Sequence, residues 1–133
     1  MEWSEEEDEH GKLSMDCGFS CTFHKPVEFG GAEDILNPED AFVGSLAMCY
    51  SITLKSMLEK MKVDLGDFEL ETKGTLEEKD GKKMITTIEL IPRIQLKEKM
   101  DKEKVKRALE LAEENCPIGN SIKSEVEINP EFG

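Results

Sequence analysis

Two cysteines stand in surroundings that could support thiol chemistry, and the first is Cys116. In the stretch EENCPIGNSI it lies between an expected helix end at Asn115 and Pro117, which can open the next helix. Backbone N–H groups at a helix N-terminus favour a thiolate, so this position makes Cys116 a candidate reactive thiol. A cysteine that only joins two helices is the competing interpretation, and the residues alone leave both open.

The second is Cys49, in NPEDAFVGSLAMCYSITL, inside a charge-free run from Ala41 to Leu54. A thiol about a dozen residues into a helix gains nothing from the helix dipole. Unless a cation stands beside it, such a cysteine is an inert buried residue. Judged alone, Cys49 is therefore expected to belong to the core.

Cys17 and Cys21 form a C-x3-C pattern within alternating apolar and polar residues from Leu13 to His24. The alternation predicts a half-buried strand or a hairpin arm. In one strand, at about 3.3 Å per residue, their α-carbons would lie roughly 13 Å apart, too far for a disulfide or a shared metal. We interpret both as small core residues, and no cofactor or metal site is expected.

Composition limits the partners. The chain has 17 basic and 30 acidic residues and a net charge of −13, which would repel nucleic acid and an anionic membrane surface. The longest charge-free stretch is shorter than the roughly 20 residues of a membrane span. The start of the chain lacks the pattern of a secretion signal, so we expect a cytoplasmic protein with reduced cysteines.

The pattern of elements predicts a mixed α+β domain with antiparallel pairing. Residues 1–10, MEWSEEEDEH, are expected to form an acidic, frayed N-terminus, and residues 11–133 a single domain. After the first strand pattern, the expected elements are a helix over 38–62 opened by Asn37 and Pro38, strands over 68–77 and 84–96 joined at Asp80-Gly81, a helix from Asp101 to Asn115, a short helix from Pro117 and a closing strand in SEVEINP.

The helix from Pro38 has no polar face for nearly four turns. A helix that is apolar all round must be covered all round, and one sheet covers only one side. We expect the remaining cover to be a second copy of the same helix, which places this segment at the centre of a homodimer.

The two thiol segments together resemble the OsmC/Ohr family, the osmotically inducible and organic hydroperoxide resistance proteins. The resemblance rests on EFGG, NPEDAFVGSLAMCYSITL and AEENCPIGNSIK, and extends from about Gly30 to the C-terminus. It implies an antiparallel sheet packed on a long central helix, in an intertwined homodimer with active sites at the subunit interface. It also implies thiol-dependent reduction of organic hydroperoxides.

Residue by residue, the resemblance makes Cys49 the peroxidatic thiol, Cys116 the resolving thiol and Glu39 the glutamate of the N-P-E motif. A thiolate attacks the O–O bond, becomes a sulfenic acid and releases an alcohol, and the second cysteine condenses with it to a disulfide. A dithiol then restores both thiols by exchange, and the family implies a lipoyl-type reductant.

One family feature has no counterpart. Family peroxidases carry an arginine that pairs with the glutamate, whereas the only arginines here are Arg93 and Arg107. The aligned stretch reads EDEHGK, in which His10 and Lys12 are the candidate substitutes. A lysine lacks the planar fork that can engage a carboxylate and a thiolate together.

Two other functions remain open at this point. The chain could be a non-enzymatic protein of the same fold that binds a small apolar ligand between subunits and uses its cysteines as a redox sensor. It could also be a structural protein with buried cysteines. Saturable peroxide consumption with added dithiol separates the enzyme from the first alternative. Slow labelling of both thiols by a small alkylating agent at neutral pH would favour the second.

Overall fold

The structure, a computed structural model, describes residues 1–4, 10–97 and 100–133. It divides into two compact units, Met1–Phe42 and Val43–Gly133, each of which is described by itself. The single domain expected over residues 11–133 stays a prediction.

The first unit contains three short antiparallel strands. β1 (Glu2–Ser4) pairs with β2 (His10–Ser14), which pairs in turn with β3 (Ser20–Phe23). The acidic, frayed N-terminus expected over residues 1–10 stays a prediction: Glu2–Ser4 forms β1, and residues 5–9 lie outside the described residues. A single-turn helix, η1 (Val27–Phe29), follows.

The predicted start of the central helix is confirmed at Pro38. α1 (Pro38–Lys60) begins directly after Asn37, whose Oδ1 accepts a hydrogen bond from the Asp40 N–H at 2.8 Å. The helix ends two residues earlier than predicted, because Lys62 adopts a left-handed conformation with φ of 59°. There Lys62 and Val63 donate backbone hydrogen bonds to Glu59 and Leu58, which closes the last turn.

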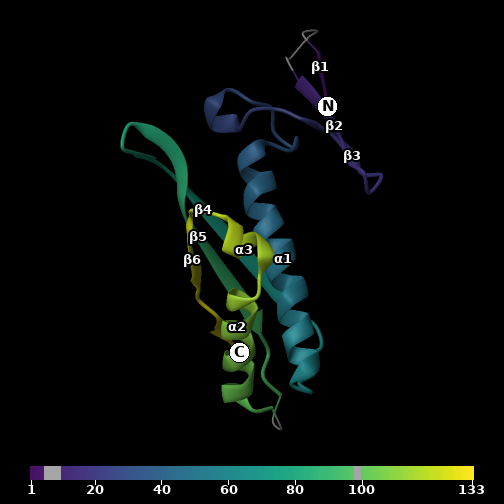
Figure 1. The fold of residues 1–133 in the computed structure, drawn as a ribbon, viewed down its shortest axis with the longest axis vertical. Helices are drawn as coiled ribbons and strands as arrows, with labels where there is room; N and C mark the ends of the chain where they lie inside the picture. The colour runs from purple at the N-terminus through teal and green to yellow at the C-terminus, as the bar shows by residue number, and fades with distance from the viewer. Residues whose placement is uncertain (5–9, 98–99) are drawn as a thin grey trace. The chain divides into compact units, whose positions relative to one another are not determined.

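The second unit contains one mixed sheet beside α1 (Figure 1). β4 (Glu69–Lys79) and β5 (Lys82–Ile94) form the predicted hairpin, and both turn residues, Asp80 and Gly81, have positive φ. β6 (Glu125–Ile128) and β7 (Glu131–Phe132) also pair with β5.

The predicted antiparallel pairing holds between β4 and β5, whereas β6 and β7 pair with β5 in parallel. Parallel neighbours need a long crossover connection. Here the crossover carries α2 (Lys102–Glu114) and α3 (Pro117–Ser121), so the chain returns to the sheet running in the same direction as β5. The α+β fold class itself is confirmed.

The core of the second unit lies between the sheet and the helices. α1 contributes a stripe at four-residue spacing, α2 contributes one apolar face, and β5 contributes residues of its second half. The buried side chains are Leu46, Tyr50, Leu54 and Leu58 of α1, Val105, Ala108, Leu109 and Ala112 of α2, Ile88, Leu90, Ile91, Pro92 and Ile94 of β5, and Leu65 and Cys116 outside these elements. Asp101 caps α2 by accepting hydrogen bonds from Glu103 and Lys104.

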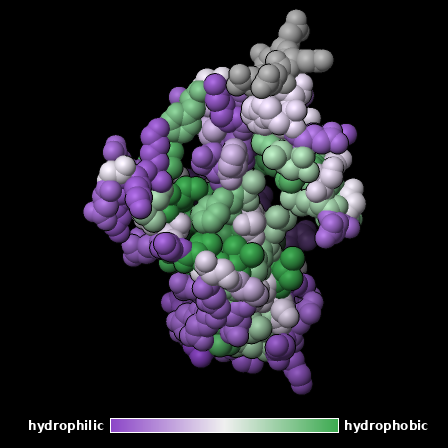
Figure 2. All heavy atoms as spheres, turned by 45° about the horizontal axis from the view of Figure 1, so that its top comes forward, coloured by the Kyte–Doolittle hydropathy of each residue, from purple (hydrophilic) through white to green (hydrophobic). Residues whose placement is uncertain are grey.

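A large part of α1 remains uncovered within one chain. Met48 and Ile52 are 65% and 72% exposed. Figure 2 shows hydrophobic atoms gathered in the middle of one face of the molecule and hydrophilic atoms over the lower end of that face. Among the described residues α1 is the one helix long and apolar enough to cross a membrane by length and composition alone, criteria that the core helix of a soluble protein also meets.

Candidate functional site

Cys116 lies at the joint between α2 and α3, as predicted. It is the N-cap residue of α3, and its Sγ accepts a hydrogen bond from the Gly119 N–H at 3.4 Å. The side chain is only 1% exposed. The structure therefore confirms the predicted position of Cys116 at the helix joint. It also shows that the side chain is almost completely shielded from solvent, which the sequence did not predict.

Cys49 lies in the middle of α1 and is half-buried. Its side chain is in hydrogen-bond contact with that of Cys116, although the two residues belong to elements far apart in the chain. Both are free thiols. The structure therefore brings together the two cysteines that the family resemblance pairs, and it does so within one chain and one unit.

The surroundings of Cys116 disfavour the thiolate form of its side chain. Burial raises the pKa of Cys116 above its ordinary value, because an apolar environment disfavours the charged thiolate. Backbone N–H groups of Gly119 and Ile118 act in the opposite direction but offset only part of this effect. Contact with Cys49 raises the pKa further. The activation expected from the helix N-terminus is thus outweighed by burial.

A pocket of about 220 Å³ opens beside Cys116. Residues of α1, α2, α3, the α2–α3 joint and the sheet line this pocket. They are Leu46, Tyr50, Leu90, Glu113, Cys116, Gly119, Asn120, Ser124 and Val126. Cys49 does not belong to this lining. Cys116, which the family resemblance makes the resolving thiol, is therefore the cysteine that belongs to the pocket lining.

Tyr50 and Glu113 are residues of this site that sequence reasoning missed. The Tyr50 hydroxyl is buried and donates a hydrogen bond to the Leu109 carbonyl at 3.2 Å, which ties α1 to α2. Burial raises the pKa of Tyr50 well above its ordinary value, and the charges of Glu113 and Cys116 raise it further. For Tyr50, its position next to Cys49 was a signal in the sequence. For Glu113 the sequence offered none, because this residue comes to the site from another helix, α2.

Glu39 lies in the first unit, in the first turn of α1. Its Oε2 atom is buried and has no hydrogen-bond partner among the described residues. A buried carboxylate oxygen is costly unless a donor or a cation satisfies it. The buried Oε2 atom of Glu39 could therefore accept a hydrogen bond from a donor group or pair with a cation.

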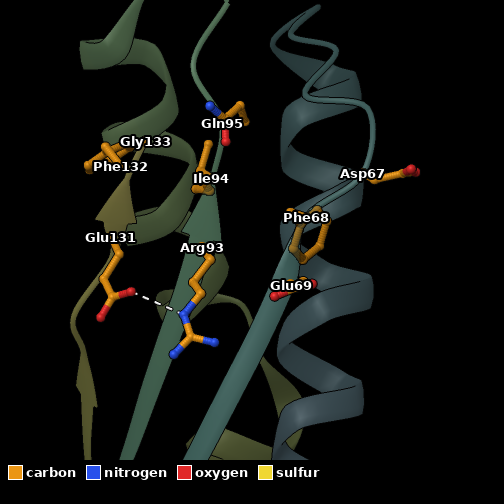
Figure 3. Close-up of a pocket in the computed structure, with 9 residues that line it drawn as sticks. All are labelled: Asp67, Phe68, Glu69, Arg93, Ile94, Gln95, Glu131, Phe132 and Gly133. Atoms are coloured by element: carbon orange, nitrogen blue, oxygen red, sulfur yellow. Dashed lines mark hydrogen bonds and ion pairs between the residues drawn. The ribbon is translucent and has the colours of Figure 1, made fainter.

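Both arginines of the chain pair with glutamates instead. Arg93 on β5 forms ion pairs with Glu71 and, at 3.1 Å, with Glu131 of β7. Figure 3 shows this second pair at the rim of a separate pocket between the ends of β4, β5 and β7. Arg107 pairs with Glu110 one turn along α2. The candidate substitutes His10 and Lys12 both lie on β2 in the first unit.

The other two cysteines do not belong to the core as predicted. Cys17 lies in an exposed turn between β2 and β3, and Cys21 on β3 is only partly buried. The turn forms because Gly18 adopts a positive φ of 94°, so the two cysteines do not share one strand. Among the described residues, no group of three His, Cys, Asp or Glu side chains could hold a metal ion.

Comparison with known proteins identifies the family. Residues 31–131 match the family described as OsmC-like protein, and this chain belongs to that family. The uncharacterized protein YmaD of Bacillus subtilis is 30% identical over 109 residues, which cover 80% of this chain and 73% of YmaD.

Solved structures share the fold at lower sequence identity. An OsmC-like protein of unknown function from Vibrio cholerae has a TM-score of 0.84 at 22% identity, over 93% of this chain and 86% of that one. The organic hydroperoxide resistance protein OhrB of Bacillus subtilis has a TM-score of 0.70 at 21% identity, over 98% and 94%. Another organic hydroperoxide resistance protein, from Legionella pneumophila, has a TM-score of 0.74 at 19% identity, over 99% and 93%.

Proposed function

We propose that this protein is a thiol-dependent peroxidase that reduces organic hydroperoxides through a sulfenic acid and disulfide cycle. The observation that carries the proposal is the contact between the Cys49 and Cys116 side chains. Such a pair can trap a sulfenic acid as a disulfide before further oxidation destroys it. The names of the solved relatives OhrB and the Legionella protein, both organic hydroperoxide resistance proteins, point to the same substrate class.

In this proposal Cys49 reacts first. Its thiolate attacks the O–O bond, takes up one oxygen as a sulfenic acid and releases the alcohol. Cys116 then attacks the sulfenic sulfur, expels water and forms the disulfide. Cys116 is poorly suited to the first step because it is 1% exposed and its pKa is raised. A dithiol of lipoyl type restores both thiols by exchange.

The proposed enzyme is a homodimer built around α1. Only 22% of the most apolar window of this helix is buried within one chain. Met48 and Ile52 would be unfavourably exposed in a monomer, and a second copy of α1 supplies an apolar surface of the same kind. We place the dimer in the cytoplasm, where reductants keep cysteine pairs in the dithiol form at rest.

The proposal is tested by oxidising the reduced protein with one equivalent of cumene hydroperoxide and mapping its disulfides by mass spectrometry. We expect a bond between Cys49 and Cys116, and continuous peroxide consumption when a dithiol is added. A redox sensor or ligand binder would stop after one turnover. A structural protein would show neither the bond nor consumption, and a bond through Cys17 or Cys21 would contradict the assigned pair.

Glu39 is proposed to act on the partner subunit's Cys49 or through a bound cation. Ten helical residues rise about 15 Å, which is beyond the reach of a glutamate to a sulfur on the same straight helix. Glu39→Gln is expected to lower kcat/KM at least about tenfold, a loss of about 1.4 kcal/mol of transition-state stabilisation.

Mixed dimers distinguish action across the interface from action within one chain. A dimer of one Glu39→Gln chain and one Cys49→Ser chain contains one complete site if Glu39 acts across the interface, and none if it acts within its own chain. We expect about half of the wild-type activity per dimer for the mixed species. Activity no higher than that of the two parent variants would contradict the assignment across the interface.

A further inference from the structure

His24 is a buried histidine that the proposed reaction does not use. Its side chain is 8% exposed, and no aspartate, glutamate, lysine or arginine in the described part of the chain is buried to this extent. Its Nδ1 atom is enclosed and has no hydrogen-bond partner among the described residues. A buried ring nitrogen without a partner costs free energy, so such an atom normally marks a bound water, a ligand or a second polar group.

The backbone holds His24 beside the start of α1. Its N–H donates a hydrogen bond to the Leu36 carbonyl at 2.9 Å, and Phe23 and Leu36 form a parallel bridge. One residue further along both segments, His24 comes level with Asn37, the residue directly before α1. Glu39 follows in the first turn of α1 and belongs to the same compact unit.

Close packing on both sides fixes the position of His24. A Cβ atom on Gly11 of β2 would overlap with the Phe23 ring, so this ring packs directly on the β2 backbone. A Cβ atom on Gly31 would overlap with the Lys25 carbonyl group, so the loop after His24 folds back tightly on itself. The imidazole therefore belongs to a well-packed part of the first unit.

Glu39 supplies the acceptor that His24 lacks. Its Oε2 atom is also buried without a hydrogen-bond partner among the described residues. A carboxylate oxygen accepts, whereas Nδ1 of a histidine donates when it carries the proton, as in the imidazolium and in one of the two neutral tautomers. The remaining buried side-chain atom without a partner in the described chain, Thr72 Oγ1, belongs to the second unit. Within the first unit, the two atoms therefore complement each other.

We propose that His24 is a positioning residue for Glu39, and that one bound water accepts a hydrogen bond from the His24 Nδ1–H and donates one to Glu39 Oε2. Bridging waters typically join buried polar atoms that do not bond each other directly. His24, and not the candidate substitutes His10 and Lys12, is then the group that satisfies Glu39. The consequence for catalysis rests on the proposed function, whereas the contact itself does not.

The histidine spectrum tests the contact directly. The chain has two histidines, so in protein labelled with ¹⁵N at histidine the variant His10→Gln leaves only the His24 ring to be observed by NMR. We expect an Nδ1–H proton that exchanges slowly with water. Glu39→Gln should accelerate this exchange about tenfold, because a hydrogen bond to a charged group is replaced by a neutral one. Asp40→Asn removes an equal charge from the same turn of α1 and should leave the exchange rate nearly unchanged.

Two outcomes of this experiment would overturn the proposal: an Nδ1 atom that carries no proton, and equal responses to Glu39→Gln and Asp40→Asn. The spectrum decides the contact whether or not the protein consumes peroxide. Failure of the peroxidase proposal is recognised separately, as absence of peroxide consumption by the wild type.

Two substitutions of His24 test the consequence for catalysis. The side-chain amide of asparagine reaches the place of Nδ1 and that of glutamine the place of Nε2, so His24→Asn keeps the proposed contact and His24→Gln loses it. In the steady-state consumption of cumene hydroperoxide, we expect His24→Gln to lower kcat/KM about tenfold and His24→Asn less than about threefold. The double variant His24→Gln/Glu39→Gln should lie within about twofold of Glu39→Gln, because both changes remove the same contact.

The order of the two variants separates positioning from packing. Glutamine is closer than asparagine to histidine in volume, so a role limited to filling space predicts that His24→Gln retains more activity than His24→Asn. That order, or a double variant in which the two losses multiply, would overturn the role of His24 in positioning Glu39.

Discussion

Cys49→Ser is expected to abolish peroxide consumption. A serine hydroxyl is not ionised at neutral pH, so the side chain at position 49 can no longer attack the O–O bond. Loss of a nucleophile lowers kcat by on the order of 10³-fold or more. The measurement is the steady-state consumption of cumene hydroperoxide with a dithiol present. Cys17→Ser and Cys21→Ser serve as controls and are expected to retain wild-type rates, because neither residue is in the thiol pair.

The complementary variant, Cys116→Ser, identifies which thiol reacts first. With no partner to condense with, the sulfenic acid on Cys49 should persist and be trapped by dimedone after one equivalent of hydroperoxide. If the sulfenic acid appears instead on Cys116 in the Cys49→Ser protein and turnover survives there, the two roles are reversed. That result would also mean that the buried N-cap position of α3 activates a thiol despite its raised pKa.

Much of the local structure could be predicted because single residues set the backbone. Asn37 opens α1, Asp101 caps α2, and the Asp80-Gly81 turn joins β4 to β5. Each of these signals acts through a hydrogen bond or a φ angle within a few residues, so no knowledge of the tertiary structure is needed. The family resemblance then supplied the pairing of distant cysteines, which local patterns left open.

The errors come from features that sequence periodicity does not record. Leu13 to His24 alternates as a single strand would, but a turn interrupts it at Gly18 and carries Cys17 into solvent. The direction of β6 depends on how far the α2–α3 crossover returns along the sheet. Glu113 could not be found because its place near Tyr50 depends on the packing of α2 against α1.

In the structure the apolar residues of α1 form two surfaces, one buried within its own unit and one exposed. Leu46 is 1% exposed and faces the core of its own unit, where it lines the pocket beside Cys116. Ile52 is 72% exposed within the same helix. Substitution of one or the other therefore separates the stability of the protomer from that of the proposed dimer.

Ile52→Asp is expected to dissociate the dimer without unfolding the chain. Burial of an isoleucine contributes about 1.5–3 kcal/mol, and two-fold symmetry makes each substitution count twice, so the dissociation constant should rise about 10²- to 10⁴-fold. Analytical ultracentrifugation measures this constant, and Ile52→Val should change it less than about tenfold. Leu46→Asp should instead lower the free energy of unfolding by about 3 kcal/mol or more, since it buries a charge without a partner.

An Ile52→Asp protein with the dissociation constant of the wild type would show that this face of α1 is not the dimer interface. Loss of peroxidase activity together with dissociation would place the active site at that interface, because the Cys49–Cys116 contact lies within one chain and would survive in the monomer.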